Sequence, residues 1–182
     1  SPIDVVPITL AWVAADGTSP FKRAKAFDEA YGPKTVEILV VEAGSAPVPQ
    51  ATLDAYETDL NGDPVLGTEG ILLLNTQATV TRYTQTGVDV VATVKGPTSA
   101  KAAIEAAIAV YLQPNAQNED GTYIHDFGET LYRDGLRDII FDAAAGIKNV
   151  PTLTLNGVAA DLVLAAKALP VVGAAPAITM VA

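Results

Sequence analysis

The chain has 182 residues, of which 49% are hydrophobic, and its 21 acidic and 11 basic residues give a formal net charge of −10. This composition predicts a folded protein of one or two small domains and excludes wholesale disorder. The negative charge argues against binding to nucleic acid or to anionic membrane surfaces. The absence of cysteine excludes disulfides, thiolate metal sites and cysteine nucleophiles.

Two further features concern membranes and targeting. The longest apolar runs, such as Ile71–Leu74, are far shorter than the ~20 residues that a membrane-spanning helix needs. The N-terminus, Ser1–Asp4, lacks the basic region and long apolar core of a signal peptide. We therefore expect neither a membrane-spanning protein nor a signal peptide.

The first part of the chain is predicted to alternate helices and strands. Ser19 can cap a helix that begins at Pro20 and is ended by Gly32. Apolar residues follow at helical spacing: Phe21, Ala24, Phe27 and Tyr31. We therefore expect a helix from Pro20 to Tyr31, followed by a buried strand over the β-rich run Thr35–Val41.

A second helix and strand are expected next. Leu53, Tyr56 and Leu60 lie on one face of a helix that runs from Pro49 to Leu60 and stops at Asn61-Gly62. The run Gly70–Leu74 is again typical of a strand. From Ala78 to Lys95 the pattern alternates, with a turn at Thr86-Gly87, which predicts a hairpin or a long bent strand.

The later elements are predicted with a different order. A helix follows Gly96-Pro97-Thr98 and ends at Leu112, and the polar segment Gln113–Tyr123 is an exposed loop. Asp126 and Glu129 form a capping box for a second helix, which Gly146 ends. Strands are expected at Val150–Leu155, Leu162–Leu164 and Ala177–Val181, with a turn at Asn156-Gly157.

These elements predict an α+β protein of two small αβ subdomains. The change in element order falls within Thr76–Gly87, so we expect an N-terminal subdomain over residues 1–77 and a C-terminal module over residues 78–182. The second is a strand-helix-helix-strand unit with additional C-terminal strands, and both of its helices are expected on one face of its sheet.

Two residue groups are compatible with metal binding. His125, the only histidine, stands beside Asp126 and four residues before Glu129, but a metal would need further ligands, and a loop histidine at a helix start is the simpler interpretation. The segment Asp59–Asp63 resembles the start of a calcium loop, yet Pro64 occupies the position where an EF-hand turn requires glycine. A helix-ending turn explains it better.

The sequence gives less support to other kinds of catalytic or binding site. The stretch Gly96–Lys101 lacks the Gly-Lys-[Ser/Thr] order of a phosphate loop, and Thr98 and Ser99 are expected to cap the following helix. None of the serines lies in a nucleophile-elbow motif. A carboxylate-dependent hydrolase would need two acidic side chains to converge in the fold. We therefore predict no catalytic, cofactor-binding or metal-binding residues, and no enzyme.

The order of motifs in the second half resembles one family. The strand-helix unit from Val88 ends in Tyr111-Leu112, a helix closes at Gly146-Ile147, and a strand begins at Val150. Asp161–Leu164 and Leu169–Gly173 then precede the last strand. The chain is similar to baseplate J-like proteins, the wedge subunits of contractile phage tails and related injection machines, from about Pro20 to Met180 and most strongly after Val88.

The resemblance implies a virion structural protein of the tail baseplate, assembled in the host cytoplasm. Its implied partners are other wedge proteins, sheath and tail-hub proteins, and further copies of itself in a six-fold ring around the tail tube. The chain is short for the family, which implies a minimal member or a fragment. The alternative left open by the residues themselves is a small-ligand-binding or regulatory α+β domain.

Overall fold

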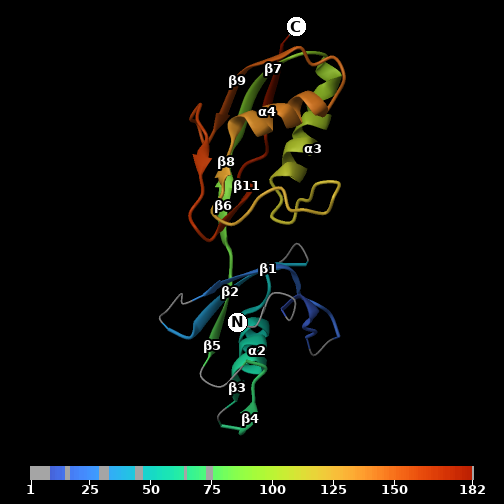
Figure 1. The fold of residues 1–182 in the computed structure, drawn as a ribbon. Coiled ribbons are helices and arrows are strands. Elements are labelled where there is room, and N and C mark those ends of the chain that lie inside the picture. Colours follow the sequence, from blue (N-terminus) through green and yellow to red (C-terminus); the bar gives the residue numbers. More distant parts are fainter. Residues whose placement is uncertain are drawn as a thin grey trace. The chain divides into compact units, whose positions relative to one another are not determined.

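The structure, a computed structural model, describes residues 9–14, 17–28, 33–43, 47–63, 65–72 and 76–181 (Figure 1). The chain forms two compact units, an N-terminal unit, Ser1–Tyr83, and a C-terminal unit, Thr84–Ala182. The division lies between Tyr83 and Thr84, whereas the sequence places it between residues 77 and 78. Helices and several small sheets occur together, which confirms the α+β class.

In the N-terminal unit, helix α2 (Gln50–Asn61) packs against a three-stranded sheet. Strand β2 (Thr35–Glu42) lies between β1 (Phe21–Asp28), which is antiparallel to it, and β5 (Gln77–Arg82), which is parallel. Helix α2 (Gln50–Asn61) lies in the connection from β2 to β5. The strand over Thr35–Val41 and the helix over Pro49–Leu60 are thus confirmed. Their core is a single cluster that includes Ile38, Val40, Leu53, Tyr56 and Leu60.

The helix predicted from Pro20 to Tyr31 is wrong, because residues 21–28 form strand β1. A register shift between Phe21 and Arg23 interrupts the alternation of side chains, so Phe21 and Ala24 both reach the core although they are three residues apart. Beyond the shift, Ala24 and Ala26 pack against the core. Lys25 lies 5.7 Å from the ring centroid of Phe27, its neighbour on the other face. Residues 29–32 lie outside the described part.

A short hairpin follows α2. Strands β3 (Gly62–Asp63) and β4 (Thr68–Glu69) are antiparallel. The strand expected over Gly70–Leu74 is not formed at residues 70–72, and residues 73 and 74 lie outside the described part. A Cβ atom on Gly70 would collide with the backbone carbonyl oxygen of Leu60, so the chain returns past the helix end at a distance that only glycine permits.

The C-terminal unit is built around a second three-stranded sheet. Strand β7 (Val90–Lys95) is central, antiparallel to β9 (Asn149–Leu155) and parallel to β12 (Ala177–Val181). Helices α3 (Lys101–Tyr111) and α4 (Arg133–Asp142) cover one face of it, as expected (Figure 1). The core between them includes these side chains: Val90, Ala92, Val94, Ile104, Ile108, Leu136, Ile140, Leu153 and Ile178.

Two small strand pairs complete this unit. Strands β6 (Thr84–Val88) and β11 (Ala168–Val172) are parallel, and β8 (Thr130–Leu131) pairs antiparallel with β10 (Leu162–Val163). Strand β11 is absent from the sequence prediction. The turn predicted at Thr86-Gly87 is wrong, because both residues belong to β6. Val171 pairs with Gly87 in the register of these two strands.

The start of α4 differs from the prediction. The N–H of Asp126 does donate to Oε2 of Glu129 at 2.8 Å, which is one half of a capping box. The four residues form a turn, however, and strand β8 intervenes before α4 begins at Arg133. Gly146 has a φ of 85°, the left-handed geometry expected of it, but the helix has already ended at Asp142.

Strands β5, β6 and β7 follow one another with single-residue breaks. Only Tyr83 separates β5 from β6, and only Asp89 separates β6 from β7. These strands do not pair with one another, so the segment is not a hairpin. The N–H of Tyr83 donates to the carbonyl of Val40, and that of Thr84 to the carbonyl of Lys167.

Candidate protein-binding surface

The structure places His125 in a buried structural position. Its side chain is 5% exposed, its Nε2 lies 2.9 Å from the carbonyl oxygen of Tyr111, and its ring meets the Tyr111 ring edge-on with centroids 4.6 Å apart. The neighbouring Asp126 accepts from the N–H of Phe127 and Glu129 accepts from the N–H of Asp126. His125 thus holds the loop onto the end of α3, while the bonds of Asp126 and Glu129 are local to residues 126–129.

The oxygen-bearing side chains of Asp59–Asp63 point to separate partners. Asp59 accepts from Nε1 of Trp12 at 2.8 Å. Asn61 accepts from the N–H of Ala78 and donates to its carbonyl, which ties α2 to β5. Asp63 accepts from two N–H groups of the hairpin turn. The segment ends α2 at Asn61, as predicted, and its oxygens stabilise the N-terminal unit.

The stretch Gly96–Lys101 forms the entry to α3. A 3-10 turn, η1 (Thr98–Ala100), precedes the helix, and neither start is capped by a side-chain hydrogen bond. The capping predicted for Thr98 and Ser99 is therefore wrong. Lys101 lies 3.7 Å from Glu105 and makes an exposed helical ion pair with it.

Within the described ranges, no three acidic or histidine side chains converge closely enough to hold a metal ion. None of the helices in those ranges has the length and apolar character to cross a bilayer. The polar side chains singled out in the sequence therefore do not meet in one site in this part of the chain. The surface does carry two apolar features, a groove and a hairpin turn.

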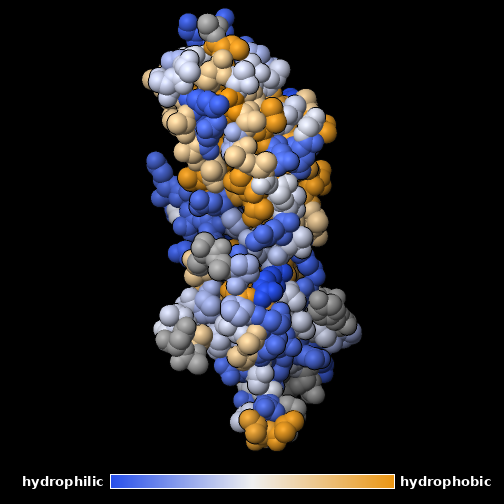
Figure 2. Space-filling view, turned by 180° about the vertical axis from the view of Figure 1, so that it is seen from behind, coloured by the Kyte–Doolittle hydropathy of each residue, from blue (hydrophilic) through white to orange (hydrophobic). Residues whose placement is uncertain are grey.

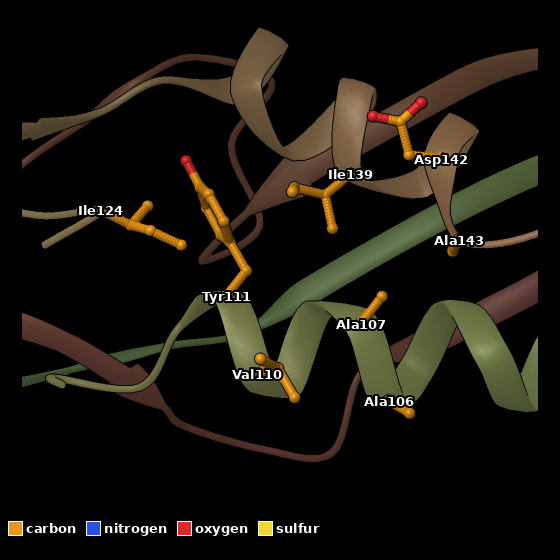
Figure 3. A pocket seen from close by; sticks show the side chains of 8 residues that line it. All are labelled: Ala106, Ala107, Val110, Tyr111, Ile124, Ile139, Asp142 and Ala143. Atoms are coloured by element: carbon orange, nitrogen blue, oxygen red, sulfur yellow. The ribbon is translucent and has the colours of Figure 1, made fainter. Parts of the chain in front are cut away.

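An apolar groove lies between α3 and α4 (Figure 3). It has a volume of about 390 Å³ and eight lining residues: Ala106, Ala107, Val110, Tyr111, Ile124, Ile139, Asp142 and Ala143. Asp142 is the only charged one. Since three of the eight are alanines, the helix backbones are accessible to a close neighbour.

Tyr111 forms the wall at one end of the groove. Its ring is held in place by His125, and a Cβ atom on Gly135 of α4 would lie 3.0 Å from the Tyr111 hydroxyl oxygen. Glycine at position 135 thus makes room for the phenol beside α4. The polar loop Gln113–Tyr123, exposed over residues 117–122 as predicted, leads into Ile124, which lines the groove near Tyr111 (Figure 3).

The groove has a negative electrostatic environment. Burial raises the pKa of the Tyr111 phenol above its usual value of 10.0, and the charges of Glu129 and Asp138 raise it further. Asp138 lies one turn before Asp142 on α4. On these helices, Lys101 pairs with Glu105, Arg137 pairs with Asp134, and the guanidinium of Arg133 donates to the carbonyl of Ala159. The apolar lining is thus bordered by the carboxylates of Asp138 and Asp142, neither of which forms an ion pair among the described residues.

A second apolar feature is the turn of the β3–β4 hairpin, which appears as an orange patch in Figure 2. Val65 is 90% exposed and Leu66 is 75% exposed. The carboxylate of Asp63 accepts from both of their N–H groups, at 2.8 and 3.2 Å. The backbone is thereby satisfied from within the hairpin while the two side chains face water.

Sequence reasoning missed both surfaces. The groove depends on the pairing of two helices separated by the loop, which periodicity does not give. A signal for it is present, however, in the second apolar stripe of α3, formed by Ala103, Ala106 and Val110 on the side away from the buried Ile104 and Ile108. For the second surface, the comparable signal is the pair of apolar residues Val65 and Leu66 at the hairpin turn.

Comparison with known proteins gives a likeness of fold. No protein-family model and no curated protein matches the chain. A solved structure with a similar fold is a chain of the anti-feeding prophage baseplate, determined by cryo-EM and six-fold symmetrised, with a TM-score of 0.60 and 12% identity. The match covers 94% of this chain and 37% of the baseplate chain. The two chains share a fold, and this one spans about a third of the other's length.

Proposed function

We propose that the chain is a structural subunit of the baseplate of a contractile phage tail or a related injection machine. The observation that supports this most strongly is the fold it shares with a chain of the anti-feeding prophage baseplate, which extends over 94% of its length. The motif order from Val88 to Met180, which resembles that of baseplate J-like proteins, supports the same conclusion from sequence.

The proposed role is that of a wedge subunit. Copies of the chain would assemble with one another and with other wedge proteins into a six-fold ring around the tail tube, in contact with sheath and tail-hub proteins. The location is the tail baseplate of a particle assembled in the host cytoplasm. The role is non-enzymatic, and the apolar groove and hairpin turn are surfaces suited to protein-protein contacts.

The test is whether the chain is part of a particle. The affinity-tagged chain is produced from its own genome in place of the untagged one, and contractile particles are purified by density gradient. We expect the chain to sediment with the particles and to be visible by cryo-EM at the baseplate, in six copies or a multiple of six. Particles that assemble without the chain would contradict the proposal.

A further inference from the structure

The outer side of α3 carries an apolar stripe that its own unit does not cover. Ile104 and Ile108 are buried against the sheet. About half a turn away around the helix, Ala103, Ala106 and Val110 face outward at spacings of three and four, and Val110 is 57% exposed. A helix that is apolar on two faces is typical of one packed on both. The second face borders the α3–α4 groove.

The shape of the groove favours a helix as its occupant. Its walls are two helices, and Ala106, Ala107 and Ala143 present methyl groups where longer side chains would hold a third helix away. The larger Val110, Tyr111 and Ile139 can then contact the leucine-sized side chains that recur every three or four residues on an amphipathic helix.

The charge of the groove determines the chemistry of that helix. Asp142 lines it, Asp138 lies one turn earlier, and neither forms an ion pair within the described part of the chain. Glu129 adds to the same negative field, which acts on Tyr111. A helix with lysine or arginine beside its apolar stripe complements this border. A second copy of this chain, with 21 acidic and 11 basic residues, fits it poorly.

We propose that the α3–α4 groove binds an amphipathic helix of a different protein, one that places apolar side chains against Val110 and Tyr111 and basic side chains against Asp138 and Asp142. The inference rests on the proposed function, because the partner is taken to belong to the same particle. It adds the binding surface and the chemistry of the partner.

The experiment uses the full chain in cells that assemble the complete particle. A photo-crosslinking amino acid, p-benzoylphenylalanine, replaces Val110 in one variant and Val158 in the control. The control is closely matched, because both residues are valines and their exposures are 57% and 60%. After irradiation of purified particles, the adduct of the Val110 variant is identified by mass spectrometry.

The expected result is one discrete adduct, absent from the Val158 control, on a helical segment of another particle protein that carries lysine or arginine. Combining the Val110 crosslinker with Asp138→Asn and Asp142→Asn should lower its yield, whereas Asp134→Asn, on the same helix, should not. The decrease should be about threefold or more, as expected from the loss of two ion pairs that become partly desolvated on binding.

Three results would overturn the inference. An adduct with a second copy of this chain, or with an acidic or extended segment, contradicts the chemistry assigned to the partner. Particles that contain the chain but give equal yields at Val110 and Val158 show that the groove is not a contact, and leave the proposed function intact. Particles that lack the chain refute the proposed function itself.

Discussion

The carboxylate of Asp161 accepts a hydrogen bond of 2.9 Å from the backbone N–H of Arg133, the first residue of α4, from 28 positions along the chain. The residue before the helix, Tyr132, makes no side-chain capping bond. The guanidinium of Arg133 in turn donates to the carbonyl of Ala159 at 2.6 Å. The start of α4 is therefore capped by the loop before β10.

We predict that Asp161→Ala lowers the stability of α4 by about 1 kcal/mol, the usual cost of a lost helix cap. Hydrogen exchange followed by mass spectrometry should show faster exchange in peptides that cover residues 133–142, with little change in α3. Asp161→Asn keeps an acceptor oxygen and should retain most of the protection. Equal exchange in all three proteins would show that the bond does not stabilise the helix.

A second prediction concerns the end of α2. Gly70→Ala should destabilise the N-terminal unit by about 1–3 kcal/mol, because its methyl group meets backbone atoms of Leu60 and Asn61 that cannot move independently. Trp12, the only tryptophan, reports on this unit, since its ring lies 5.1 Å from that of Tyr56. Denaturant unfolding followed by tryptophan fluorescence measures the change.

The control for that substitution lies in the same hairpin. Gly67 has a φ of 66° and open space around its missing Cβ. Asparagine tolerates this left-handed conformation, so Gly67→Asn should change stability by less than about 1 kcal/mol. If the two variants unfold at the same denaturant concentration, the close approach at Gly70 is not what the hairpin requires.

Alkaline pH should weaken the C-terminal unit through Tyr111. Burial, Glu129 and Asp138 raise the pKa of the Tyr111 phenol above 10.0. At a pH between the unfolded-state and folded-state pKa values, the phenol therefore stays protonated in the folded chain and is ionised in the unfolded chain. This contribution is complete below pH 10 and is lost as pH rises through the folded-state pKa. Tyr111→Phe should therefore reduce the decline in stability above pH 10, measured by circular dichroism in urea. The same change at Tyr132, which is 57% exposed, should not.

The hairpin turn should be dispensable for folding. Replacing Val65 and Leu66 with serine should change the stability of the N-terminal unit by less than about 0.5 kcal/mol, because both side chains are already in water. Tryptophan fluorescence in denaturant again provides the measurement. A loss comparable to that of a core substitution would mean that the two side chains pack against the protein after all.

Strong periodicity made much of the fold predictable. Helices α2 and α3 follow from apolar residues at helical spacing, and strands β2, β9 and β12 follow from short runs of β-forming residues. Strand β11 was not predicted, and Pro170 lies in its middle. It is accommodated in a pair of only two strands, where one edge of the strand needs no partner.

Two errors have tertiary causes. In β1, the register shift beside Phe21 lets Phe21 and Ala24 both reach the core although they are three residues apart, and pairing with β2 then decides between helix and strand. At α4, the residues that satisfy the capping pattern, Asp126 and Glu129, close a turn, while the acceptor that caps the helix comes from Asp161. Strand β2 and Asp161 both lie outside the segments whose patterns were read, so those patterns alone could not identify them.

The passage of the chain through Tyr83 has a mechanical consequence. This one residue joins a strand of the N-terminal sheet to a strand of the C-terminal unit, and the N–H groups of Tyr83 and Thr84 are both hydrogen-bonded, each within its own unit. Because no loop separates the two strands at this junction, tension applied across it has no loose segment to extend first. A pull on either unit is carried at once by the backbone hydrogen bonds of β5 and β6, which must break before the chain can extend.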